Sequence, residues 1–272
     1  MRIACCIWAL SESETDTLRQ IHEIGFDTID IQPGQQRSLE SRLLAQELGL
    51  RISCVGASFG LPDGAALDHV EPNGRQRALD HVIGAINHAA DIAADTVYVI
   101  PGIEAEPAAI ARYRRSIAQL ADVAAEREIK LAIEHFPGMA LPTAGETLQF
   151  IRQLDHDNLY LLYDSGHIQM SGEDPETVIA NAGDKLGYVH FDDNDGLSDL
   201  HWSLLDGVMT DESLVATLRA LDAVGYQGAL SLELNPSLAK PANALTDSRD
   251  VLTRAMLRAW MPRWSTSGKS HT

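Results

Sequence analysis

The sequence alternates short apolar runs with longer amphipathic segments along nearly its whole length. The runs are rich in Val, Ile and Leu, and in the segments between them apolar residues recur every three or four positions, the spacing of one helix face. Glycine follows several of these segments, as at Gly25, Gly49 and Gly225, where it favours the end of a helix. We therefore expect strands at 2–8, 28–31, 50–55, 96–100, 130–134, 158–164, 186–191 and 228–233.

The segments between the expected strands also carry residues that are typical of helix starts. Pro107 stands at the beginning of one segment, and Thr143-Ala144-Gly145-Glu146 has the pattern of a capping box. We expect helices at 14–24, 39–48, 75–93, 107–128, 174–182, 211–224 and 242–260, and one that begins near Thr143. Residues 56–72 and 192–207 are expected to be loops.

Eight strand–helix units in a chain of 272 residues predict a single-domain α/β protein, a (β/α)8 TIM barrel. A doubly wound open sheet is the alternative, but no Gly-x-Gly-x-x-Gly follows the first strand and no P-loop motif occurs. We expect the barrel to cover residues 1–262. Residues 263–272 are rich in Ser, Thr and Gly, and we expect them to form a flexible tail.

The chain is strongly acidic, with 39 acidic and 21 basic residues and a formal charge of −18. This charge and the lack of a dense Lys/Arg patch disfavour nucleic-acid binding, which depends on neutralising phosphates. The sequence contains no run of about 18 apolar residues, so we expect no membrane span. A strand-like run begins at Arg2, so we expect no signal peptide before it. Cys5, Cys6 and Cys54 lie in apolar runs without a Cys-x-x-Cys motif, which indicates buried thiols and a reducing cytoplasm.

Four consecutive expected strands end in residues that can bind metal. The fifth ends in Glu134, the sixth in Asp164, the seventh in His190 and the eighth in Glu233. Because the C-terminal strand ends of a barrel share one face, the three carboxylates would repel one another there unless a cation were bound. The four residues therefore predict a divalent metal site. Three carboxylates and one imidazole suit Mn²⁺, our first expectation, and also Mg²⁺, Co²⁺ or Zn²⁺.

The chain resembles the xylose isomerase-like TIM barrel superfamily of sugar phosphate isomerases and epimerases, to which the AP endonuclease family 2 enzymes are related. The likeness covers residues 1–260 and rests on Ile133-Glu134-His135, Tyr163-Asp164-Ser165-Gly166-His167, Val189-His190-Phe191-Asp192-Asp193, Asp199-Leu200-His201 and Leu232-Glu233. The resemblance implies that Glu134, Asp164, His190 and Glu233 hold the metal. It also implies that the two glutamates act catalytically on opposite faces of a substrate, which His167 contacts.

Two branches of the superfamily differ from this chain at particular positions. The endonuclease branch has a zinc set matched by His167, Asp199 and His201. Its other zinc histidines are missing here, because the third strand ends in Gly56-Ala57-Ser58-Phe59 and the fourth in Ile100-Pro101-Gly102. We therefore do not expect AP endonuclease activity. Ketose 3-epimerases carry an arginine where this chain has Gly196, and Asp199-Leu200-His201 is similar to the broader group that includes inosose-type isomerases and dehydratases.

Further residues near the strand ends are candidates for contacts with a substrate. His167 follows Asp164 by three residues across an expected Ser-Gly turn, where it can contact a hydroxyl, carry a proton or make a structural hydrogen bond. His201 and Asp199 are candidates for substrate binding or a second metal, or for loop solvation and capping. Trp8 and Trp202 are candidates for pocket walls against sugar C–H faces, or for ordinary core and loop aromatics.

We expect a metal-dependent sugar isomerase or epimerase that moves a proton of a ketose or keto-polyol through an enediolate, with Glu134 and Glu233 as catalytic base and acid. An inosose-type dehydratase or other lyase on a keto-sugar would use the same residues, so it stands as the alternative. A barrel that binds a sugar or a protein without turnover is the alternative of another class. The expected partner is a small-molecule sugar, and the resemblance is compatible with a homo-oligomer.

Overall fold

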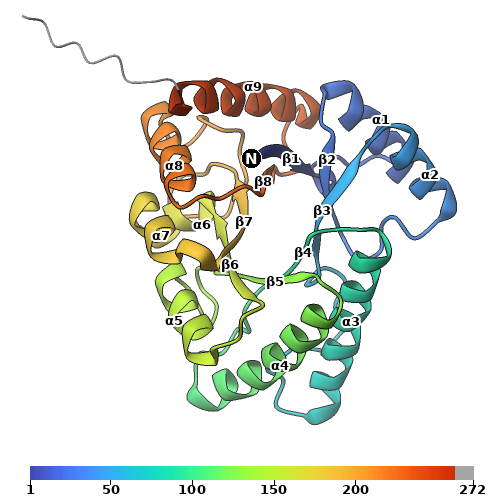
Figure 1. Cartoon of the computed structure of the whole chain (residues 1–272), viewed down its shortest axis with the longest axis vertical. Coiled ribbons are helices and arrows are strands. Elements are labelled where there is room, and N and C mark those ends of the chain that lie inside the picture. Colours follow the sequence, from blue (N-terminus) through green and yellow to red (C-terminus); the bar gives the residue numbers. More distant parts are fainter. Residues whose placement is uncertain (261–272) are drawn as a thin grey trace, which may run out of the picture.

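The computed structural model describes residues 1–260, which form a closed barrel of eight parallel strands surrounded by helices (Figure 1). The strands follow one another around the barrel in chain order, and β8 closes it by pairing with β1. The predicted single-domain TIM barrel is therefore confirmed. The strands are β1 (Arg2–Cys6), β2 (Thr28–Ile31), β3 (Arg51–Gly56), β4 (Thr96–Val99), β5 (Lys130–Glu134), β6 (Leu159–Asp164), β7 (Leu186–Phe191) and β8 (Ala229–Leu232).

The helices cover the outside of the barrel, where their apolar faces pack on the strands (Figure 1). They are α1 (Glu14–Ile24), α2 (Leu39–Glu47), α3 (Pro72–Asp91), α4 (Pro107–Glu126), α5 (Ala144–Leu154), α6 (Ser165–Ser171), α7 (Pro175–Ala182), α8 (Asp211–Ala223) and α9 (Pro241–Trp260). No helix within 1–260 has the length and apolar character that a bilayer crossing needs. The expected tail, 263–272, and the last two residues of the expected barrel lie outside the described residues.

Two expectations about the top of the barrel are wrong. The first strand ends at Cys6, and Ile7–Ala9 form the short 3₁₀ turn η1, so Trp8 lies beyond the strand rather than in it. After Asp164 the chain forms helix α6 instead of a simple Ser-Gly turn, because the Asp164 side chain accepts a hydrogen bond from the His167 N–H at 2.8 Å and so caps a new helix.

Two residues expected to begin or end helices, Thr143 and Gly25, do so in the structure. Gly25 closes α1 in the left-handed conformation, with φ +99°, which residues with a Cβ rarely adopt. Thr143 caps α5 by accepting the Glu146 N–H at 3.1 Å, but the Glu146 carboxylate accepts the Thr143 hydroxyl rather than its backbone N–H, so only half of the expected capping box forms. A complete box occurs instead at Thr210 and Ser213, which begin α8.

The inside of the barrel is filled by a small separate cluster of side chains. Its members are Ala4, Cys54, Tyr98, Ala132, Leu162, Tyr188 and Ala229. The two tyrosine rings fill the space that the small residues leave, so the barrel interior is a packed floor beneath the C-terminal face rather than a pore. Cys5, Cys6 and Cys54 are all buried free thiols.

Candidate metal centre

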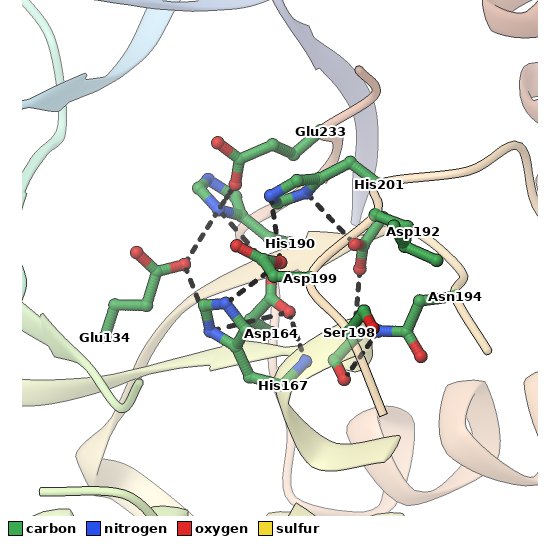
Figure 2. A network of polar contacts seen from close by, with 12 residues as sticks. Glu134, Asp164, His167, His190, Asp192, Asn194, Ser198, Asp199, His201 and Glu233 are labelled. Carbon is green, nitrogen blue, oxygen red and sulfur yellow. Dashed lines mark hydrogen bonds and ion pairs between the residues drawn. The ribbon is translucent and has the colours of Figure 1, made fainter. Parts of the chain in front are cut away.

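Four neighbouring strands bring the predicted ligand residues to one point of the C-terminal face (Figure 2). Glu134 ends β5 and Asp164 ends β6, while His190 lies in β7 directly opposite Asp164 in the strand register. Glu233 follows β8, where its N–H bonds to the Phe191 carbonyl at 3.1 Å. Parallel pairing therefore places side chains from four distant parts of the sequence at one level of the barrel.

The side chains converge closely. His190 Nδ1 lies 2.7 Å from Glu233 Oε2, 3.5 Å from Glu134 Oε1 and 4.0 Å from Asp164 Oδ2. One ligand atom from each of the four residues lies within 4.8 Å of all the others. Asp164 and His190 have no exposed surface, and Glu134 and Glu233 are 4% and 7% exposed. Ions with ligand distances of about 2.1 Å need ligand atoms separated by distances of this order.

The atoms that face one another are also the ones that lack other partners. Glu134 Oε1, Asp164 Oδ2, His190 Nδ1 and Glu233 Oε2 are all buried, and within 1–260 none has a hydrogen-bond partner. An unpaired buried polar atom is costly, and four of them aimed at one space are hard to account for by packing. The donor set therefore fits a divalent cation.

Two of the carboxylates are held by their second oxygen. Asp164 Oδ1 accepts the His167 N–H, and Glu233 Oε1 accepts the Trp8 Nε1–H at 3.0 Å. Each carboxylate is thus fixed by one oxygen and presents the other toward the cluster. Trp8 thus lies at the site as a partner of Glu233, and its ring packs on Phe59 with centroids 5.0 Å apart.

The charges of the cluster are strongly coupled. Burial raises the pKa of Asp164 well above its usual value, and the nearby Asp192 carboxylate raises it further. Burial would also raise the pKa of Glu233, but His190 outweighs it and lowers that pKa to about 2. For His190, burial favours the neutral ring, but Glu233 and Asp30 raise its pKa well above the usual value. A proton on His190 therefore offsets carboxylate charge that a bound cation would neutralise instead.

A second group of polar side chains adjoins the first cluster (Figure 2). His201 bridges two carboxylates, with Nδ1 3.0 Å from Asp192 Oδ2 and Nε2 3.0 Å from Asp199 Oδ1. Asp199 Oδ1 is also 3.4 Å from His167 Nε2. His167 Nδ1 reaches the first cluster, at 3.9 Å from Glu134 Oε1 and 3.8 Å from Asp164 Oδ1. Asp192, Asp199 and His201 could themselves hold an ion.

The carboxylates of this second group raise the pKa of its two histidines. Burial would lower the pKa of His167, but Asp164 and Asp199 raise it to about 10. Burial likewise opposes the charge on His201, whose pKa is nevertheless raised by Asp192 and Asp199. The pKa of Asp199 falls despite burial because it faces both imidazoles. The two charged imidazoles therefore lie beside the carboxylate cluster and face the Asp192 and Asp199 carboxylates.

Trp202 lies away from Glu233, in the loop that follows β7. Its backbone pairs with Asp193 through N–O distances of 3.1 and 2.7 Å, and the Asp193 carboxylate accepts the N–H groups of Gly207 and Met209. This pairing pins the loop 192–207, in which His201 has a left-handed φ of +48° that is uncommon outside glycine. The structure thus separates the two tryptophans that the sequence treats alike.

A cavity of about 240 Å³ opens beside the carboxylates. It is lined by Ser58, Phe59, Tyr98, Ile100, Glu134, Phe136, His167, Asp199, His201 and Glu233. Four residues that the sequence suggested as catalytic or substrate-binding line this cavity: Glu134, Glu233, His167 and His201. The other two candidates, Trp8 and Trp202, do not line it. Phe59 and Phe136 form aromatic walls that the sequence pattern does not single out, although their position just after the ends of β3 and β5 is a signal for such a role.

Comparison with known proteins agrees with this fold. Residues 18–255 match the family model described as xylose isomerase-like TIM barrel. L-ribulose 3-epimerase of Mesorhizobium japonicum is 27% identical over 240 residues, which cover 84% of this chain and 78% of that protein. Inosose dehydratase of Lacticaseibacillus casei is 27% identical over 161 residues, 53% of this chain and 54% of that protein. A solved structure of L-ribulose 3-epimerase has the same fold, with a TM-score of 0.80 at 23% identity over 95% of both chains.

Proposed function

Because the chain belongs to the xylose isomerase-like TIM barrel family, we propose that it is a divalent-metal-dependent epimerase or isomerase of a ketose or keto-polyol. The observation that carries the proposal is the pair Glu134 and Glu233, whose carboxylates both border one cavity and lie within 4.8 Å of each other and of Asp164 and His190. A module that only binds a sugar has no need for two opposed carboxylates on one ion. The similarity to an L-ribulose 3-epimerase supports the same function.

Glu134, Asp164, His190 and Glu233 would hold the ion, with Mn²⁺ as the first candidate and Mg²⁺, Co²⁺ and Zn²⁺ as alternatives. When bound, a divalent cation supplies a Lewis acid that polarises a substrate carbonyl and lowers the cost of removing the neighbouring proton. The protein's own part is to keep these ligands buried and oriented. Trp8 and the first turn of α6 do this for Glu233 and Asp164.

The two glutamates carry the proton transfers. One of them removes the proton next to the carbonyl, and the enediolate that results has one glutamate near each face. If the second glutamate returns a proton to the same carbon from the opposite face, the product is an epimer. If a proton is instead added to the former carbonyl carbon, the product is an aldose–ketose isomer. His167 and His201 border the same cavity, and we expect them to donate hydrogen bonds to substrate hydroxyls in place of their contacts with Asp199.

Dehydration is the second candidate function. The support for it is the protonated pair His167 and His201, since either can give a proton to a departing hydroxyl, together with the similarity to an inosose dehydratase.

The residues that line the cavity include no Lys or Arg within the described part of the chain, which favours an uncharged sugar over a sugar phosphate. A homo-oligomer and a cytoplasmic location stay predictions.

Proton NMR in D₂O tests the proposal. Manganese-free protein loaded with Mg²⁺ or Zn²⁺, which keep the spectra sharp, is incubated with ketoses, ketose phosphates and keto-inositols. We expect deuterium next to the carbonyl of one uncharged compound, and the product spectrum then separates epimer, isomer and alkene. Glu233→Gln protein serves as the matched control. If metal-loaded protein brings deuterium into none of the compounds, the result would count against enolisation. If the protein binds no metal, the sugar- or protein-binding alternative would be favoured.

A further inference from the structure

A further acidic residue lies directly beneath the metal cluster. Asp30, in the middle of β2, has no exposed surface. Its Oδ1 accepts hydrogen bonds from Tyr188 Oη at 2.5 Å and Ser53 Oγ at 2.7 Å, and its Oδ2 lies 3.8 Å from Cys6 Sγ, which donates to it. Four strands, β1, β2, β3 and β7, thus contribute to a polar network inside the barrel. Nothing in the sequence pattern drew attention to Asp30.

The Oδ2 side of this carboxylate also faces His190. Asp30 Oδ2 is 3.4 Å from His190 Nε2, the ring nitrogen that points away from the carboxylate cluster. The opposite nitrogen, Nδ1, is the one 2.7 Å from Glu233 Oε2. The imidazole also lies between two tyrosine edges, with ring centroids 5.3 Å from Tyr98 and 5.6 Å from Tyr188 and interplanar angles of 89° and 88°. These rings limit how far the imidazole can turn.

We propose that Asp30 is a positioning residue for the metal centre. When the ion is bound, Asp30 accepts the Nε2–H of His190 and thereby leaves the Nδ1 lone pair free to face the ion. Metal-binding histidines generally donate their other N–H to a carboxylate or carbonyl, which fixes the tautomer. Tyr188 has two parts in this arrangement, since its hydroxyl holds Asp30 and its ring packs against His190. The inference rests on the metal site proposed above.

The network makes Asp30→Asn a sharp test. Tyr188 and Ser53 both donate to the Oδ1 side, so the substituted side chain would place its amide oxygen there to accept these bonds. Its NH₂ group would then point to His190 Nε2. Because NH₂ is a donor, it favours a lone pair on Nε2 and a proton on Nδ1, the atom that should bind metal. The isosteric change thus opposes metal binding while it preserves the size of the side chain.

Mn²⁺ affinity measures the effect directly, through the electron paramagnetic resonance signal of free Mn²⁺ during titration of full-length protein. We expect Asp30→Asn to weaken binding about 10- to 100-fold, the range found when such supporting residues are lost. Asp68→Asn, which removes another buried carboxylate from the loop between β3 and α3, is the control for loss of negative charge, and we expect its affinity to stay within about threefold of wild type.

The outcomes separate this inference from the proposed function. If wild-type protein binds no Mn²⁺, the metal site itself is wrong and the role of Asp30 goes with it. If wild type binds Mn²⁺ and Asp30→Asn binds within threefold, or if Asp68→Asn loses as much affinity, the metal site stands and the inference is overturned. Circular dichroism of both variants establishes that they are folded.

Wild-type protein provides a second test that does not depend on the folding of Asp30→Asn. Long-range ¹H–¹⁵N NMR of histidine-labelled protein loaded with Zn²⁺ distinguishes protonated from unprotonated ring nitrogens, with the His190 signals assigned by their loss in His190→Gln. We expect a proton on Nε2 and none on Nδ1. A proton on Nδ1, or an unprotonated Nε2, would overturn the inference even if Asp30→Asn failed to fold.

Discussion

Replacement of Trp8 by phenylalanine tests how the structure holds Glu233. The indole Nε1–H donates to Glu233 Oε1 at 3.0 Å, and this bond leaves Oε2 to face His190. Phenylalanine removes the donor but keeps an aromatic ring to pack on Phe59, whose centroid lies 5.0 Å from that of the indole. Glu233, 7% exposed, would therefore keep its place but lose the contact that orients it.

The size of the effect follows from that one bond. A hydrogen bond to a charged group contributes about 1.5 to 3 kcal/mol, and each 1.4 kcal/mol corresponds to about a factor of ten. If the bond is lost without a substitute, the affinity for Mn²⁺ should fall about 10- to 100-fold. The rate of deuterium exchange into a responsive ketose should fall by a similar factor, because Glu233 is a proposed acid–base residue.

Trp202→Phe is the matched control for this change. Trp202 is joined to Asp193 through backbone groups, and the substitution leaves those groups intact. We expect its Mn²⁺ affinity and exchange rate to stay within about threefold of wild type. The reasoning would be refuted by Trp8→Phe protein that is folded and within threefold of wild type in both measurements, or by equal losses in the two variants.

Three further predictions concern catalysis, metal and helix capping. Glu233→Gln and Glu134→Gln should abolish turnover while the far-ultraviolet circular dichroism stays unchanged; activity within threefold of wild type would remove that residue from the mechanism. Mn²⁺ at about 100 times its dissociation constant should stabilise chelator-treated protein by about 2.7 kcal/mol and release protons on binding, which differential scanning calorimetry and a pH indicator would measure; an unchanged melting temperature would contradict the metal site. Asp174 caps α7, and hydrogen bonds from the Thr177 hydroxyl and N–H lower its pKa, so Asp174→Ala should cost about 1 kcal/mol in urea unfolding at pH 7. Because the folded pKa lies below the unfolded one, the stabilisation from the ionised form is complete above the unfolded pKa and is lost as pH falls through the folded pKa; a gap between wild type and variant that did not narrow in acid would contradict this cause.

Much of the site could be predicted because a barrel converts chain order into spatial order. Once Glu134, Asp164 and His190 are recognised as the ends of successive parallel strands, their proximity follows from the topology, whatever helices and loops lie between them. The same logic gives no information about residues inside the barrel or beyond the strand ends. In the sequence, Asp30 is therefore an ordinary residue of a buried strand, and Phe59 and Phe136 are ordinary loop aromatics.

The sequence by itself determined the barrel and the four metal-type strand ends, since apolar periodicity and helix-end residues are local signals. Only the tertiary structure decided which atoms meet. Trp8 and Glu233 are 225 positions apart and Asp30 and Tyr188 are 158 apart, yet each pair shares a hydrogen bond. Such contacts depend on side-chain direction across a closed sheet, which no local pattern specifies. The roles of Trp8 and Asp30 therefore follow from closure of the barrel, which brings β1 beside β8 and lets strands face one another across its interior.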